Sequence, residues 1–291
     1  MHKTTADEVL LTGWQATGED AFTVTARWPV DHPFYEPVAG FQDPMLIAES
    51  VRQAVPLLSH VAYGVPFGHC QSWSRFRYSL ESDGLATACG PTDVELRITC
   101  TDVTRRGTVL AGMTMHVDLV ADGMPLGTAQ STFRNHAPAI YRRLRGEYAD
   151  TAWSKAVAAP VPMAVPPRSV GRRCEDDVVL ALAGPLTPGH LLRVNTRHPI
   201  LFDHPLDHAP GMLLLEAARQ AANSTAGHQR LIPTTFDASF ARYVELDAPC
   251  WIQVDQVSAT ANGSCSVRLS ALQEHERVFT ALVGLERLGA R

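Results

Sequence analysis

Two apolar segments of this chain each hold a glutamate that is followed, three residues later, by an arginine. The first segment carries Glu49 and Arg52, and the second carries Glu216 and Arg219. Residues at this spacing lie on one face of a helix, so each carboxylate can contact its guanidinium. A buried carboxylate with a raised pKa can act as the base in acyl transfer, and an arginine can bind a phosphate. These four residues are therefore candidates for catalysis and substrate binding.

The same spacing also fits a purely structural role. A charge in apolar surroundings is costly unless it is paired, so Glu49 and Glu216 need partners whatever else they do. Plain ion pairs, within a helix or between domains, would meet that need. The recurrence of the pair fits both interpretations, because a duplication copies scaffold as well as sites.

Two histidines precede the second glutamate, at His204 and His208. An imidazole can act as a general acid or base near neutral pH, but Asp-His turns also use the ring to bond local backbone. The spacing of the two histidines is found among metal ligands as well. Pro205 lies between them and opposes the helix that would align the rings, and no third ligand is evident, so we expect no metal and no other cofactor.

The start of the second apolar segment offers a further binding element. Gly211 and Met212 would lie at the first turn of a helix, where backbone N–H groups have no intrahelical acceptor. Such N–H groups, aided by the helix dipole, can bind the carbonyl oxygen of a thioester. No phosphate-binding glycine loop and no nucleophile elbow is present, so direct transfer is expected; Cys70 and Cys89 stay open as nucleophiles.

The two glutamate segments are copies of one another. Residues 45–54 recur at 212–221, and upstream His32-Pro33 matches His198-Pro199. A repeat of this kind predicts two copies of one structural unit. The length of 291 residues suits two domains that each bury a core.

A proline-rich stretch separates the two copies. Residues 156–167 hold four prolines and predict an extended linker. We therefore predict an N-terminal domain over 1–150, a linker over 151–173 and a C-terminal domain over 174–291.

Each half is predicted to contain one long helix. Asp43-Pro44 is typical of a helix start, with an acid at the cap and a proline in the first turn. This helix should end near Val55, because Pro56 follows. The second helix should span 210–222 and be buried on nearly every side, because apolar residues surround it.

Alternating apolar residues elsewhere predict antiparallel strands joined by hairpins. Strands are expected at 21–28, 76–80, 94–100, 113–119, 178–182 and 191–194, with turns at Arg106-Gly107, Asp122-Gly123, Asn262-Gly263 and His275-Glu276. One helix wrapped by an antiparallel sheet is the hot-dog fold. The predicted class is α+β, with two hot-dog domains in tandem that form an intrachain pseudo-dimer.

The composition and charge of the chain argue against some classes of function. A net charge of −5 opposes a broad nucleic-acid surface, and no run of residues is long and apolar enough to cross a bilayer. The six cysteines lack Cys-x-x-Cys spacing, which suits a reducing cytoplasm. The basic cluster Tyr141–Arg145 reads as a solvated helix or turn, or else as a dock for an acidic carrier protein or a phosphate.

Three motifs carry a resemblance to a known family. Residues 63–69, 141–146 and above all 197–220 resemble the A-factor synthase (AfsA) family of streptomycetes. The resemblance implies an acyltransferase that moves a β-ketoacyl group from an acyl carrier protein or coenzyme A thioester to the hydroxyl of dihydroxyacetone phosphate. The ester then cyclises toward butenolide, γ-butyrolactone or furan signals that control antibiotic production.

The resemblance favours a functional role for the repeated Glu and Arg residues, whose positions match the motif of the family. We expect Glu49, Glu216 and His204 to be catalytic. The expected substrate-binding residues are Arg52, Arg219, Gly211, Met212 and His208. In dimeric hot-dog enzymes a histidine loop faces the helix acid of the other copy, which predicts that His204 faces Glu49. Whether the chain pairs further into a homodimer stays open.

A weaker likeness points to a rival function. His204, Pro210-Gly211 and Glu216 are similar to a segment of the hydroxyacyl carrier-protein dehydratases, but His204 lies two residues closer to Pro-Gly than in that family. The alternatives to the acyltransferase are a hot-dog thioesterase or dehydratase and a non-catalytic acyl-binding module.

Overall fold

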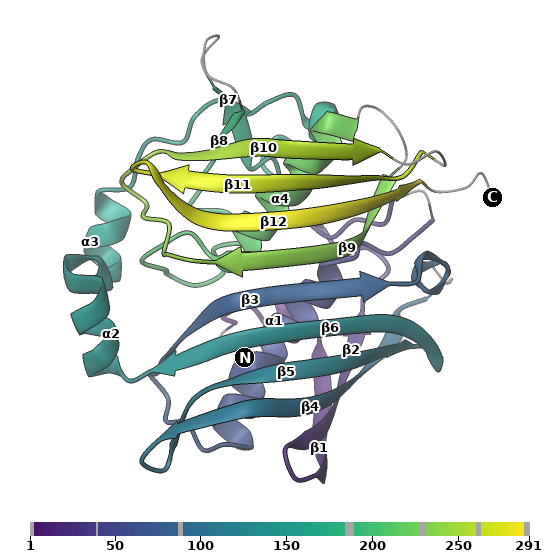
Figure 1. Cartoon of the computed structure of the whole chain (residues 1–291), viewed down its shortest axis with the longest axis vertical. Helices are drawn as coiled ribbons and strands as arrows, with labels where there is room; N and C mark the ends of the chain where they lie inside the picture. The colour runs from purple at the N-terminus through teal and green to yellow at the C-terminus, as the bar shows by residue number, and fades with distance from the viewer. Residues whose placement is uncertain are drawn as a thin grey trace. The chain divides into compact units, whose positions relative to one another are not determined.

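The computed structural model describes residues 3–38, 40–86, 90–183, 189–226, 231–259 and 263–287 (Figure 1). The chain divides into two compact units, Met1–Leu144 and Arg145–Arg291. No helix among the described residues is long and apolar enough to cross a membrane.

Unit 1 packs one long helix, α1 (Met45–Val61), against an antiparallel sheet. The alternation expected for a half-buried strand is clear in β2, where Phe22, Val24 and Ala26 face the core. In spatial order the strands of this sheet are β1 (Leu11–Gly18), β2 (Ala21–Trp28), β4 (Thr92–Arg106), β5 (Val109–Ala121), β6 (Met124–His136) and β3 (Cys70–Leu80).

Unit 2 repeats this arrangement around α4 (Gly211–Ala226). Its sheet contains β9 (Leu231–Phe240), β12 (Glu276–Arg287), β11 (Cys265–Gln273), β10 (Cys250–Ala259), β8 (His190–Leu192) and β7 (Leu180–Leu182), in that spatial order. The short helices α2 (Pro138–Arg145) and α3 (Thr151–Ala156) lie between the two repeats in the chain. The hot-dog arrangement predicted for each half is confirmed.

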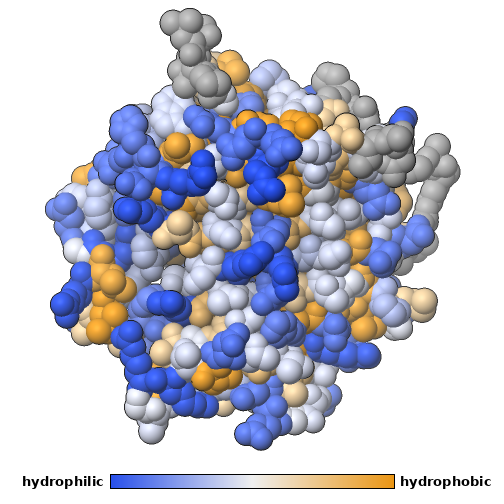
Figure 2. All heavy atoms as spheres, in the orientation of Figure 1, coloured by the Kyte–Doolittle hydropathy of each residue, from blue (hydrophilic) through white to orange (hydrophobic). Residues whose placement is uncertain are grey.

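The core of each unit lies between its helix and the inner face of its sheet. Figure 2 shows that the viewed sheet faces carry mostly polar or intermediate side chains, with apolar residues in small groups. This distribution is what alternating burial along the strands produces.

The predicted start of α1 is confirmed and its predicted end is wrong. Asp43 Oδ1 accepts a hydrogen bond of 2.9 Å from Met45 N–H, as a capping acid should. The helix nevertheless continues past Pro56 to Val61. Val55 and Leu58 on either side of this proline are buried, so core packing offsets the lost hydrogen bond.

Helix α4 is buried as its composition predicted. Every residue from Met212 to Ala222 is buried, although the helix runs on to Ala226 rather than ending at Ala222. The predicted strands near residues 178–182 and 191–194 are present but shorter, as β7 and β8.

Two of the expected hairpin turns share a left-handed backbone. Asp122 and Gly123 between β5 and β6 have φ of 49° and 81°, which a tight hairpin requires. The turn before Glu276 has φ of 67° at His275. The expected turn at Arg106-Gly107 also joins two strands, β4 and β5, whereas Asn262 lies outside the described residues.

The proline-rich stretch contains neither helix nor strand between α3 and Pro167, apart from an isolated bridge between Ala164 and Ala181. The predicted residue bounds of the two domains and the linker stay a prediction.

Replacing the capping acid should weaken unit 1. We expect Asp43→Ala to lower the free energy of unfolding by about 1 kcal/mol, because Met45 N–H loses its acceptor. Asp43→Asn should lose less, since an amide oxygen also caps. Denaturant titration checks both variants, and equal stability of Asp43→Ala and the parent would contradict the cap.

Candidate functional site

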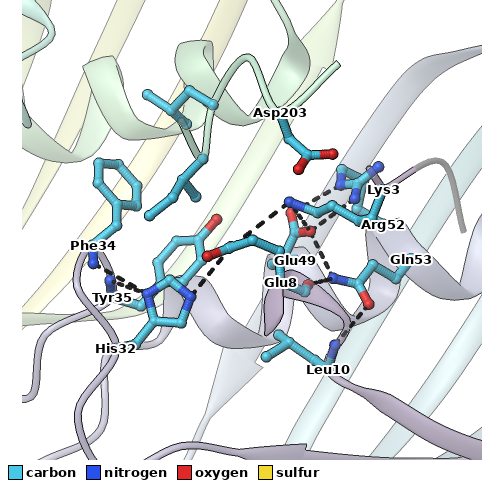
Figure 3. A network of polar contacts seen from close by, with 12 residues as sticks. Lys3, Glu8, Leu10, His32, Phe34, Tyr35, Glu49, Arg52, Gln53 and Asp203 are labelled. Carbon is cyan, nitrogen blue, oxygen red and sulfur yellow. Dashed lines mark hydrogen bonds and ion pairs between the residues drawn. The ribbon is translucent and has the colours of Figure 1, made fainter. Parts of the chain in front are cut away.

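The first glutamate lies in a buried cluster of donors in unit 1. Figure 3 shows Lys3, Arg52 and Gln53 converging on Glu49. Arg52 Nε donates to Glu49 Oε2 at 2.8 Å, and its Nη2 donates to Oε1 at 2.8 Å. Gln53 Nε2 also donates to Oε1 at 2.8 Å, and Lys3 Nζ lies 3.1 Å from the same oxygen. The carboxylate is therefore saturated with donors.

Gln53 connects this cluster to the N-terminal segment. Its Nε2 donates to the carbonyl of Glu8 at 2.7 Å, and its Oε1 accepts from Leu10 N–H at 3.0 Å. Helix α1 thereby satisfies the backbone of a segment far away in the chain. The cluster joins the helix to the start of the sheet.

The second glutamate has an equivalent cluster in unit 2. Arg219 donates to Glu216 through Nε and Nη2 at 2.8 and 2.7 Å, and Arg172 donates through Nε at 2.9 Å. Gln220 Nε2 donates to the same carboxylate at 2.5 Å and bonds the carbonyl of Asp177. The glutamate is fully buried, and both arginines are nearly so. The predicted pairing of each glutamate with its own arginine is confirmed.

The partners outside the helices were missed from the sequence. Lys3 and Arg172 are the added cations, and each is distant in sequence from its glutamate. One signal could have found them, because Lys3, Glu8 and Leu10 have the same internal spacing as Arg172, Asp177 and Val179.

The repeated His-Pro loops are structural elements. His32 Nδ1 accepts from the N–H groups of Phe34 and Tyr35, each at 3.1 Å, and its Nε2 lies 3.4 Å from Glu8. His198 repeats this, with its Nδ1 accepting from two N–H groups of the following residues and its Nε2 3.5 Å from Asp177. Both imidazole nitrogens are thus directed at the protein itself.

The electrostatics of the two glutamates oppose a role as a base. Burial raises the pKa of Glu49, but Arg52, Lys3 and Gln53 outweigh burial and bring that pKa to about 2. Burial also raises the pKa of Glu216, yet its two arginines and Gln220 leave the net pKa lowered. The condition for a base, a pKa raised by burial, is therefore not met, because both carboxylates are ionised and hydrogen-bonded. Such groups are weak bases.

The two predicted phosphate ligands differ in access. The side chain of Arg52 is 22% exposed, whereas that of Arg219 is 5% exposed. Both guanidinium groups form two hydrogen bonds to their glutamates. Of these two arginines, Arg52 is the one that a solute can reach.

The loop before α4 holds two Asp-His pairs. His208 Nδ1 lies 2.6 Å from Asp207 Oδ1, and His204 Nδ1 lies 3.6 Å from Asp203 Oδ2. The backbone is fixed close to His208, since Ala209 N–H donates to Val244 O at 2.9 Å.

The helix starts of the two units differ. In unit 1 Asp43 caps the N–H of Met45, but the corresponding residue in unit 2 is Pro210, whose side chain cannot accept a hydrogen bond. Leu213 N–H donates to Pro210 O at 2.9 Å, which leaves Gly211 and Met212 at the first turn. Their N–H groups have no acceptor within the helix. This end of α4 is suited to an oxygen with partial negative charge.

The basic cluster at residues 141–145 is more varied than the sequence indicated. Arg142 and Arg143 are exposed, as expected of a solvated helix, whereas Arg145 is buried among acidic partners.

Among the residues that the structure describes, no group of His, Cys, Asp and Glu could hold a metal ion. Cys70 begins β3, and Cys89 lies outside the described residues.

Comparison with known proteins identifies the class. The chain belongs to the family described as "A-factor biosynthesis hotdog domain", which matches residues 1–136 and 153–283. The likeness to solved structures confirms the fold. An acyl-ACP thioesterase from Bacteroides thetaiotaomicron aligns with a TM-score of 0.55 and 14% identity, covering 91% of this chain and 98% of that one. A 12:0-ACP thioesterase from Umbellularia californica aligns with a TM-score of 0.52 and 12% identity, covering 94% and 100%.

Two relatives within the family are much more similar in sequence. The 2-oxo-3-(phosphooxy)propyl 3-oxoalkanoate synthase of Streptomyces virginiae is 41% identical over 285 residues, covering 98% of this chain and 95% of the relative. A protein of the same name from Streptomyces coelicolor is 38% identical over 286 residues, covering 98% and 90%. The similarity extends over both units.

The lowered pKa of Glu49 predicts a specific acid sensitivity. Its ion pairs contribute stability that is complete above the unfolded pKa near 4.5 and is lost as the pH falls toward about 2. We expect Glu49→Gln to lower the free energy of unfolding at neutral pH by on the order of 3 kcal/mol, because buried cations lose their partner. The variant should also lose less stability than the parent between about pH 5 and pH 2.

Denaturant titration across this pH range measures both effects. Glu81→Gln is the control, since Glu81 is exposed. Parallel pH profiles for the parent and Glu49→Gln would refute the ionised, paired carboxylate.

Proposed function

We propose that this protein is a 3-oxoacyl transferase that makes a 2-oxo-3-(phosphooxy)propyl 3-oxoalkanoate. The observation that carries the proposal is the full-length similarity to synthases of that name, at 41% and 38% identity. Such a product is the ester of a 3-oxo acid with the free hydroxyl of dihydroxyacetone phosphate. The substrates that follow are dihydroxyacetone phosphate and an activated 3-oxoacyl group, here a thioester of an acyl carrier protein or coenzyme A.

The reaction is a direct acyl transfer. A base removes the proton from the acceptor hydroxyl as its oxygen attacks the thioester carbonyl, and a C–O bond forms. The C–S bond then breaks, and the thiolate takes up the proton that the base removed. Negative charge collects on the carbonyl oxygen in the tetrahedral intermediate, so donors aimed at this oxygen lower the barrier.

Unit 2 offers those donors at the start of α4. The N–H groups of Gly211 and Met212 are not used by the helix, and Pro210 provides no capping side chain. Gly211 lacks a side chain and lets an acyl group approach the backbone. We assign the thioester oxygen to this helix terminus, where the dipole adds to the hydrogen bonds.

In unit 1, Arg52 is the proposed phosphate ligand. Its guanidinium is oriented by two bonds to Glu49 and is partly exposed, so a phosphate can approach its positive charge. Glu49 and Glu216 then orient arginines instead of removing protons. Arg219 is the buried counterpart of Arg52 and supports the fold of unit 2. The predicted approach of His204 to Glu49 stays a prediction.

The chemistry of the proposed product connects the enzyme to the synthesis of signalling molecules. A 3-oxoacyl ester of dihydroxyacetone phosphate carries an activated methylene near a ketone, so it can close a ring and lose water to give a butenolide. Butenolides lead to γ-butyrolactone signals, and cyclisation of the ester along another branch leads to furan signals. Both kinds of signal regulate antibiotic production. Both substrates are metabolites of the cytoplasm, and we place the enzyme there.

Product analysis tests the proposal. Purified protein is incubated with a 3-oxoacyl-coenzyme A, with and without dihydroxyacetone phosphate, and the mixture is examined by mass spectrometry. We expect a phosphorylated ester or its dehydrated cyclic form only when the triose phosphate is present. Free 3-oxo acid formed equally without it would instead identify a thioesterase, and binding without turnover would identify an acyl-binding module.

The role of Arg52 has its own test. We expect Arg52→Gln to raise the KM for dihydroxyacetone phosphate by roughly 10-fold or more, because a charge-assisted hydrogen bond is worth about 1.5–3 kcal/mol. The KM for the thioester should change little. Arg27→Gln is the matched control, because Arg27 forms an exposed ion pair with Asp93. Equal KM values for the triose phosphate in the parent and in Arg52→Gln would exclude Arg52 as its ligand.

A further inference from the structure

The loop before α4 contains a histidine held by a carboxylate. His208 Nδ1 lies 2.6 Å from Asp207 Oδ1, a distance at which the ring donates N–H to an ionised acid. The tautomer with hydrogen on Nδ1 leaves a lone pair on Nε2. The side chain is 20% exposed, so a substrate can reach part of the ring. A carboxylate that orients an imidazole in this way is the arrangement of a general base.

The carboxylate is itself fixed by Arg145. Arg145 Nε donates to Asp207 Oδ2 at 3.1 Å, and Nη2 donates to the carbonyl of Asp207 at 3.2 Å. The same guanidinium forms two hydrogen bonds with Glu245 and lies 4.2 Å from the ring centroid of Tyr243. Arg145 is thus buried, and its guanidinium contacts two acidic residues and an aromatic ring.

The imidazole is also fixed by packing. The ring of Tyr243 meets the ring of His208 edge to face, with centroids 4.7 Å apart. Glu245 is tied to β11, since Gln273 Oε1 accepts from Glu245 N–H at 2.8 Å. The groups around His208 are therefore Asp207 on its own loop, Arg145 at the end of α2, and Tyr243 and Glu245 on the loop between β9 and β10.

The other histidines near the repeated loops are arranged differently. His198 directs both nitrogens at its own unit, and His204 Nδ1 is 3.6 Å from Asp203, beyond hydrogen-bond length. His208 is also close in sequence to Gly211 and Met212, where the thioester oxygen is assigned. His208 thus combines a short bond to a carboxylate with a partly exposed ring.

We propose that His208 is the general base that removes the proton from the acceptor hydroxyl, with Asp207 orienting it and Arg145 as a positioning residue that fixes Asp207. This inference rests on the proposed function. Nε2 accepts the hydroxyl proton as the new C–O bond forms, and the imidazolium returns that proton to the departing thiolate as the C–S bond breaks. No proton or electron is left over, and no further reactant is needed.

Chemical rescue separates a base from a structural residue. We expect His208→Ala to lower kcat for ester formation from a 3-oxoacyl-coenzyme A and dihydroxyacetone phosphate by about 100-fold or more. The KM for the thioester should change less than kcat. Added imidazole should restore part of the rate to His208→Ala. His275→Asn is the control, because His275 lies in an exposed turn with positive φ that asparagine tolerates.

Asp207 and Arg145 are tested by comparing kcat with KM in conservative variants. Asp207→Asn replaces the carboxylate that orients the ring by an amide, so it should lower kcat while the KM for the thioester changes little. Arg145→Lys keeps a positive charge for folding but loses the bidentate geometry, and it should lower kcat with normal thioester binding. An unchanged kcat in Asp207→Asn would show that Asp207 does not act on the base.

The outcomes are distinct. If the parent enzyme makes no ester, the proposed function fails. If the parent makes ester and His208→Ala retains its rate, or loses it without imidazole rescue while thioester binding persists, the assignment of His208 is overturned. Rescue of His204→Ala in place of His208→Ala would assign the base to His204 instead.

Discussion

The structure of each unit depends on one buried carboxylate that must be neutralised. Glu49 in α1 and Glu216 in α4 each lie in the interior, where an ionised acid without partners would not be tolerated. Each is neutralised by an arginine one turn along its helix and by a cation from the segment preceding the sheet. A glutamine beside each arginine then bonds the backbone of that segment. The charge therefore fixes the position of the helix relative to the chain around it.

This requirement distinguishes residues that stabilise the fold from residues that could take part in the reaction. Because both carboxylates are ionised and saturated with donors, the duplicated Glu–Arg pair explains the architecture better than it explains proton transfer. Differences between the copies are the stronger guide to function. Unit 1 caps its helix with Asp43, whereas the corresponding residue in unit 2 is Pro210. His204 and His208 have no histidine counterparts in unit 1, where Pro37 and Phe41 stand at the matching positions. We infer that the acyl-transfer chemistry is concentrated at the start of α4.

The sequence predicts the repeated part of the fold well, because burial and spacing determine it locally. The strand at 21–28, the hairpin turn at Asp122-Gly123 and the burial of α4 all follow from residue periodicity. The end of α1 could not be predicted, since core packing around Pro56 overrides the local preference of proline. The lowered pKa of Glu49 could not be inferred from the Glu49–Arg52 pair alone, because Lys3 acts across a long sequence separation. The burial of Arg145 within its basic cluster was missed for the same reason, as its partners Asp207 and Glu245 are remote in sequence.

The ionised state of the two buried glutamates is the central claim, and carboxyl carbon chemical shifts measure it directly. Protein labelled with 13C at the glutamate side-chain carboxyl is titrated by NMR, with Glu49→Gln and Glu216→Gln used to assign the two signals. The account predicts that neither signal titrates between about pH 5 and pH 8, because both pKa values lie below the ordinary range for glutamate. A titration of either carboxylate near about pH 6 to 7, as for a general acid or base tuned by burial, would contradict it.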